Sequence, residues 1–225
     1  MKQIACLVSF LSIYFVSCQT EVFHDFSYEF NVNKSDEWDL NGELEWKNLY
    51  GEEGWSRASF DLKTYKELGV IGLIGGFKNN YTFDDDIVNF WEIRPWIGLE
   101  LVNKLSSKLL LKQELKGEFR NFFFNDSEYD FNFRTKFKVG LEYPLKSIEE
   151  EAEEDWIIAT EIEWFFLRNE DINERYINSR EYSLLISKKV LEGRLLSFGI
   201  RFEEYSNNLV NENDKAITVV LRLGL

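Results

Sequence analysis

The segment Lys215-Ala-Ile-Thr-Val-Val-Leu-Arg-Leu-Gly-Leu225 shows the alternation from which the fold class follows. Every second residue from Ile217 onward is Ile, Val or Leu, and the residues between them include Thr218, Arg222 and Gly224. A side-chain period of two is that of a β-strand with one apolar face. Such a strand at the end of a chain with a secretory leader is typical of proteins folded into a bacterial outer membrane.

The same period recurs through the rest of the chain. It is clearest over 86–101, where Trp91 and Ile93 alternate with Glu92 and Arg94. We expect strands at 23–33, 38–48, 54–65, 68–79, 86–101, 108–123, 131–143, 156–166, 176–188, 193–205 and 214–225. Most exceed the ~5–6 residues usual in soluble proteins and reach the ~9–11 that a tilted membrane strand needs. The sequence therefore predicts an all-β fold, an antiparallel up-and-down transmembrane β-barrel.

The number of strands follows from a parity argument. Bacterial barrels have an even number of strands, because both termini normally lie in the periplasm. The pattern above gives an odd number, so we predict about ten strands, with 23–33 as a short extra segment. A barrel of twelve strands, with one strand unrecognised, is the alternative.

The connections predict which end of the barrel is which. Three are short, at Lys66-Glu67, Asn103–Ser107 and Lys189–Gly193. Four are longer and polar: Asn79–Asp86, Asn121–Tyr129, Arg168–Tyr176 and Ser206–Asp214. Short periplasmic turns and long outer loops are usual in such barrels. The acidic connection Leu145–Asp155 is the exception, because it is long and yet falls on the periplasmic side.

A leader precedes the barrel. Lys2 is followed by an apolar segment over 4–16 and a small residue, Ser17, which is the order of a signal peptide. We predict a signal peptide over residues 1–18 and one barrel domain over residues 19–225. The alternative is a lipoprotein in which Cys18 is retained and acylated. Both cysteines, Cys6 and Cys18, lie in this leader, so the mature barrel is expected to have no disulfide.

The charged faces of the strands predict the interior. Candidates for a lumenal ion-pair network are Glu92, Arg94, Glu100, Lys112, Glu114, Lys116, Glu118, Arg120, Arg134, Lys136, Lys138, Glu142, Glu161, Glu163, Arg201 and Arg222. Acids and bases nearly cancel on these faces, so the formal net charge of −14 is expected mainly in loops and turns. Opposite charges in a narrow lumen should pair, because leaving them unpaired is costly. We therefore expect a largely closed lumen rather than a wide pore.

Catalytic and cofactor chemistry find little support. The single histidine, His24, lies near the expected mature N-terminus, so we predict no enzyme, no cofactor and no metal site. Carboxylate pairs such as Glu161 and Glu163 are interpreted as salt-bridge partners rather than a glycosidase site. The acidic balance opposes nucleic-acid binding. Aromatic residues near strand ends, including the run Phe122-Phe123-Phe124, are interpreted as interfacial girdles.

Two classes of function remain open. The first is a non-enzymatic outer-membrane barrel, structural, adhesive or a narrow passage for small solutes, with a porin-type channel as a variant. Its expected partners are membrane lipid and the barrel-assembly machinery, and it is expected to be a monomer. The second is a soluble secreted barrel that holds an apolar ligand, as a lipocalin does. The two differ in which face of the strands points inward, and the alternation alone does not decide this.

Several segments resemble a known family. They are Glu92-Ile-Arg-Pro-Trp-Ile-Gly-Leu-Glu100, Leu111-Lys-Gln-Glu-Leu-Lys-Gly-Glu-Phe-Arg120, Asn132-Phe-Arg-Thr-Lys-Phe-Lys-Val-Gly-Leu-Glu-Tyr143 and Val220-Leu-Arg-Leu-Gly-Leu225. In these segments the chain resembles the outer-membrane barrels of Bacteroidota known as domain of unknown function family 2490. The resemblance implies a Gram-negative outer-membrane barrel and no established activity. The chain departs from outer-membrane strands in general at Leu225, where Phe or Trp is common.

Overall fold

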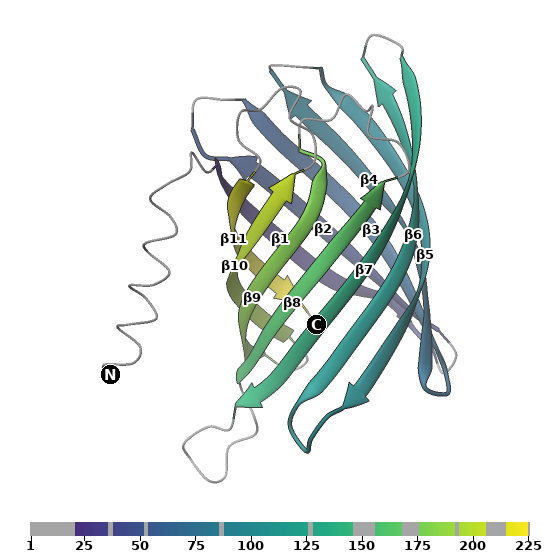
Figure 1. Cartoon of the computed structure of the whole chain (residues 1–225), viewed down its shortest axis with the longest axis vertical. Coiled ribbons are helices and arrows are strands. Elements are labelled where there is room, and N and C mark those ends of the chain that lie inside the picture. The colour runs from purple at the N-terminus through teal and green to yellow at the C-terminus, as the bar shows by residue number, and fades with distance from the viewer. Residues whose placement is uncertain are drawn as a thin grey trace.

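The computed structural model describes residues 21–35, 38–51, 54–85, 88–125, 128–145, 156–167, 176–191, 194–205 and 215–224. Its strands are β1 (Glu21–Lys34), β2 (Asp39–Leu49), β3 (Trp55–Leu68), β4 (Ile71–Asp84), β5 (Phe90–Lys104), β6 (Leu110–Phe124), β7 (Tyr129–Leu145), β8 (Trp156–Leu167), β9 (Asn178–Leu191), β10 (Arg194–Tyr205) and β11 (Lys215–Gly224). They form one closed barrel of tilted strands (Figure 1). The predicted all-β barrel is confirmed.

The barrel closes with a pair of parallel strands. Each strand is antiparallel to its neighbour in sequence, whereas β1 pairs with β11 in parallel, from Glu21 opposite Ala216 to Tyr28 opposite Leu223. The described part of the chain therefore has eleven strands, between the ten and the twelve predicted. The even-number rule assumes termini at one end of the barrel, and a parallel closure removes that assumption.

The segment 23–33 is thus a full strand rather than an addition to the barrel. Its inward side chains Phe23, Asp25 and Ser27 are buried, whereas His24 and Phe26 between them are exposed. Antiparallel pairing with β2 extends from Phe23 to Lys34, with an irregularity between Asn31 and Asn33.

Connections on alternate sides define two ends of the barrel. The loop end carries the connections β2–β3, β4–β5, β6–β7, β8–β9 and β10–β11, and the turn end carries the others. The turn between β3 and β4 is Gly69-Val70 rather than the predicted Lys66-Glu67, since β3 continues to Leu68 and Gly69 has a positive φ of 70°. The predicted leader over 1–18 lies outside the described residues, as do Leu225 and most of the connections 145–155, 168–176 and 206–214.

One glycine allows a large side chain inside the barrel. Gly76 of β4 lies opposite Trp96 of β5, and a Cβ atom on Gly76 would lie 2.5 Å from the Trp96 ring and 2.3 Å from the Leu62 carbonyl oxygen. The indole of Trp96 can therefore lie flat against the β4 backbone. Its Nε1 is 3.4 Å from Oδ1 of Asp61, across the lumen-facing side of β3.

The two faces of each strand have opposite characters. On β10 the outward side chains between Arg194 and Glu204 are Leu196, Phe198, Ile200 and Phe202. Inward side chains on the same strand include Ser197, Arg201 and Glu203. The apolar side chains thus point outward from the barrel. A soluble barrel that holds an apolar ligand would instead need them to point inward.

Candidate functional site

The candidate site is the lumen, because the alternation brings the charged faces of all strands together there. The first centre of the network is Glu92 on β5, whose side chain is fully buried. Arg94 binds it in a bidentate manner, with Nε and Nη2 at 2.8 and 2.7 Å from the two carboxylate oxygens. Arg120 on β6 donates to the same oxygens at 2.6 and 3.2 Å, and Asn80 donates at 2.9 Å. Two guanidinium groups thus enclose one carboxylate, as strong charge-assisted pairing requires.

A second centre of the network is Glu118 on β6, which lies closer to the turn end than Glu92 does. Arg134 on β7 is 2.6 Å from its carboxylate, and Arg94 and Lys136 each lie at 3.8 Å. Lys136 also pairs with Glu163 on β8 at 2.9 Å. The network therefore runs continuously from β5 across β6 and β7 to β8.

Further toward the turn end the pairs are more solvated. Glu114 lies 2.9 Å from Lys116 and 3.7 Å from Lys138, and Lys112 lies 2.5 Å from Glu142. The Lys112 side chain is 41% exposed. Glu100 and Glu161 share these inward faces but take no part in the pairs described above.

The remaining two predicted residues lie on the opposite wall. Arg201 on β10 is 3.1 Å from Asp25, 3.5 Å from Glu203 and 3.7 Å from Glu181. Arg222 on β11 is 3.9 Å from Glu29. The predicted set therefore divides between two walls, with most of it on β5–β8.

The predicted set omits several charged members of this opposite wall, among them Lys47, Lys78 and Asp25. Lys47 lies 2.5 Å from Glu203, and Lys78 lies 2.6 Å from Glu45. Asp25 belongs to the segment interpreted as an extra one. Lys47 and Lys78 have the same parity as Glu45 and Gly76 on their own strands, so parity extended to the strand ends would have found them.

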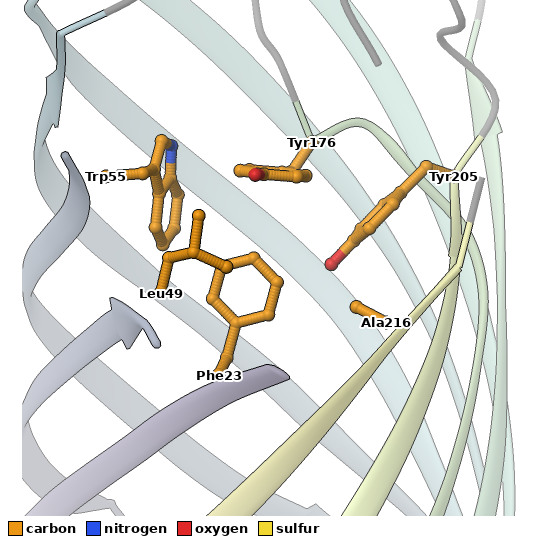
Figure 2. Packing of buried hydrophobic residues seen from close by; sticks show 6 residues of the cluster. All are labelled: Phe23, Leu49, Trp55, Tyr176, Tyr205 and Ala216. Atoms are coloured by element: carbon orange, nitrogen blue, oxygen red, sulfur yellow. The ribbon is translucent and has the colours of Figure 1, made fainter. Parts of the chain in front are cut away.

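Two clusters of buried apolar side chains lie in the lumen at the loop end, and together we call them the aromatic cap. Its members are Phe23, Leu49, Trp55, Phe90, Phe122, Phe124, Tyr176, Ile177, Tyr205 and Ala216. Figure 2 shows the half of the cap that lies around Tyr176. Each member is at most 7% exposed. The interpretation of Phe122 and Phe124 as girdle residues is therefore wrong, whereas Phe123 between them does face outward.

Two residues preceding β9 hold the cap together across the lumen. The Tyr176 ring lies 5.0 Å from Phe23, 5.1 Å from Trp55 and 5.1 Å from Tyr205 between centroids. Ile177 packs with Phe90, Phe122 and Phe124 on β5 and β6. The sequence analysis placed both residues at the start of the strand expected over 176–188, whereas β9 begins at Asn178 and both lie in the connection before it.

Rings of the aromatic cap contact the cations of the charge network. Lys47 lies 4.5 Å from the centre of the Phe23 ring, Arg57 lies 5.1 Å from Trp55, and Arg120 lies 4.7 Å from Phe122. Tyr205 donates a hydrogen bond of 2.6 Å to Glu203 from the cap side. Cation–π contacts of this kind gain strength when water is excluded. The apolar and charged layers are therefore coupled.

Below the cap, the network encloses a polar cavity of about 210 Å³. Exposure rises steadily away from the cap, from 0% for Glu92 and Arg120 to 15% for Lys136 and 41% for Lys112. Inward side chains reach water only through the lumen, so this gradient indicates access from the turn end.

Other kinds of site find no support in the described residues. His24 lies on the outer face, where its ring packs edge-on against Tyr50 at 5.5 Å, away from the lumenal carboxylates. Among the residues that the structure describes, no group of three or more His, Cys, Asp or Glu could hold a metal ion. Within the same residues, no helix is long and apolar enough to cross a membrane.

Comparison with known proteins gives a structural neighbour. No protein-family model matches the chain, and no curated protein matches its sequence. A crystal structure of the NanC porin matches with a TM-score of 0.54 over 87% of this chain and 94% of that chain, at 9% sequence identity. At this identity the similarity shows the fold alone: the chain has a closed all-β barrel similar to that of a porin.

Proposed function

We propose that this protein is a non-enzymatic β-barrel of the bacterial outer membrane whose lumen is closed. The observation that carries the proposal is the aromatic cap, which lies at the loop end of the lumen above a paired charge network. A hydrated solute cannot pass a desolvated layer of this kind without displacing it. The protein therefore acts as a structural or surface-binding barrel, and not as an open pore.

The outer face supports the membrane location. Arg194 and Glu204 on β10 are ten residue steps apart, and the outward side chains between them are apolar. At ~3.3 Å per residue and a tilt of ~40°, these charges lie about 25 Å apart along the barrel axis, which is the height of an outer-membrane apolar band. Short turns of such barrels face the periplasm, so the proposal places the turn end there and the cap near the cell surface.

A second candidate is a narrow passage for small solutes, which the polar cavity below the cap favours. In this case Tyr176 and Ile177, the two cap residues that belong to a connection, would have to leave the lumen. The two candidates differ in conductance, because only the second requires an open state.

The test of closure is conductance of the purified protein in planar bilayers. We expect little or no current from the wild-type protein and discrete openings from the double variant Phe122→Ala/Ile177→Ala. Phe123→Ala is the matched control, since Phe123 is adjacent in sequence but 44% exposed on the outer face. A stable, large current through the wild-type protein would contradict the closed lumen.

The location has a separate test. The protein should partition with the outer-membrane fraction and migrate on denaturing gels in a heat-modifiable manner. Recovery as a detergent-free soluble protein would contradict the location, whatever the conductance.

A further inference from the structure

The walls of the lumenal cavity are richer in cations than the lumen as a whole. Among the described residues that line the cavity, eleven side chains are Lys or Arg and seven are Asp or Glu. The balancing acids include Glu92 and Glu203, which are fully buried behind Arg94, Arg120 and Lys47. The first layer of side chains that a solute would meet therefore contains more cations than carboxylates, and compensating carboxylates lie behind it.

This excess lies on one wall. On β5–β8 the cavity is lined by five cations, Arg94, Lys116, Arg120, Arg134 and Lys136, and by two carboxylates, Glu118 and Glu163. On the remaining strands the lining has six cations and five carboxylates. Glu118 has Arg134 at 2.6 Å and both Arg94 and Lys136 at 3.8 Å, so three cations surround one carboxylate.

A confined site with like charges on one wall attracts the opposite charge. A bound anion would lie nearer to the cations at the cavity surface than to the carboxylates behind them, and at short range this difference in distance favours an anion. Arg and Lys groups bind carboxylates and phosphates through charge-assisted hydrogen bonds. The Trp96 ring, with the Lys116 ammonium 4.4 Å from its centre, adds an apolar surface on the same wall.

We infer that the cavity binds a small anion with carboxylate or phosphate groups on its β5–β8 wall, entering from the turn end. The inference rests on the proposed closed lumen, because the aromatic cap blocks entry from the loop end. The volume of about 210 Å³ limits the ligand to a small molecule.

Calorimetric titration of the folded protein in detergent micelles tests this with two anionic probes, citrate and inorganic phosphate, and two control solutes, calcium and glucose. We expect the two anions to bind and the two control solutes not to bind. Lys116→Gln should raise the citrate Kd about tenfold, which corresponds to the loss of one charge-assisted contact of ~1.4 kcal/mol. Lys188→Gln is the matched control, because Lys188 lies over Trp156 on the outer face and should leave the Kd unchanged.

A second variant separates binding from structural damage. Glu118→Gln removes the central carboxylate and should tighten citrate binding several-fold, whereas a damaged barrel would bind more weakly. Heat-modifiable migration checks that each variant folds, and added NaCl should weaken citrate binding to the wild-type protein. No citrate binding by the wild-type protein, an unchanged Kd in Lys116→Gln, or tighter binding of calcium than of citrate would overturn the inference. A large bilayer current with citrate binding retained would instead contradict only the closed lumen.

The parallel closure carries a second, independent inference. Because β11 runs from the loop end to the turn end and β1 runs parallel to it, Glu21 lies at the loop end and Gly224 at the turn end. With the turn end in the periplasm, as the proposed function requires, we infer that the chain enters the barrel from the cell-surface side. This is the opposite of the arrangement that an even strand number gives.

Epitope accessibility on intact cells tests this topology. A tag inserted directly before Glu21 should bind antibody on intact cells, and a tag after Leu225 should bind only after the outer membrane is permeabilised. Val22 and Ile217 are register partners, so the pair Val22→Cys/Ile217→Cys, made with Cys18→Ser, should cross-link. The pair Val22→Cys/Leu223→Cys is the matched control, since Leu223 lies opposite Tyr28. A tag before Glu21 that is accessible only after permeabilisation, or preferential cross-linking of the control pair, would overturn the inference.

Discussion

The ion pairs in the loop-end and turn-end halves of the lumen are built from the same residue types and differ in their access to water. Near the cap, Glu92 and its partners Arg94 and Arg120 are buried, and each carboxylate oxygen accepts from both arginines. At the turn end, Lys112 and Glu142 form a single contact of 2.5 Å, with side chains that are 41% and 24% exposed. Water is excluded from the ion pairs in the loop-end half, and it reaches the ion pairs in the turn-end half. The position of an ion pair along the barrel therefore sets its contribution to the free energy of unfolding more than the pairing itself does.

The largest difference is expected on breaking one pair in each half. Glu92→Gln leaves two buried arginines without their carboxylate, which should lower the free energy of unfolding by about 3–5 kcal/mol. Glu142→Gln at the turn end should cost about 1 kcal/mol or less. Urea unfolding of the protein refolded into detergent or lipid measures both. Equal losses would show that the two halves are equally solvated.

A smaller difference is expected for two tyrosine hydroxyls. Tyr205→Phe removes the donor to the buried Glu203 carboxylate and should cost roughly 1.5–3 kcal/mol. Tyr182→Phe removes the acceptor for Arg180 on the outer face, where the change should stay within about 0.5 kcal/mol. The same unfolding measurement applies. A Tyr205 variant as stable as the Tyr182 variant would mean that the cap is not coupled to the charges below it.

The smallest effect concerns salt. A double-mutant cycle on Lys112 and Glu142 should give a coupling energy of about 0.2–1 kcal/mol that falls as NaCl is added. The cycle on Arg134 and Glu118, which are 6% and 5% exposed, should give a larger coupling that changes little with salt. Equal salt dependence of the two cycles would contradict the solvation gradient.

Much of the network could be predicted from alternation alone. Glu92, Arg94, Glu118, Arg120 and Arg134 share the inward parity of their strands, and a period of two is sufficient to group them. The pairing of Arg120 with Glu92 rather than Glu118 could not be predicted, because it depends on the stagger between β5 and β6.

The aromatic cap could be predicted only in part. Phe122 and Phe124 share the inward parity of Arg120 on β6, so alternation places them in the lumen and Phe123 outside. Tyr176 and Ile177 contact strands that are distant in sequence, such as β1 and β5, and no local pattern records such contacts.

The alternation in the sequence is sufficient to give each strand an apolar face and a charged face, because successive side chains point to opposite sides of an extended chain. It also gives strands long enough to cross a bilayer. Which face points inward, and how many strands close the ring, follows from the folded barrel. These depend on how β1 meets β11, which is a contact between opposite ends of the chain and leaves no trace in either strand alone.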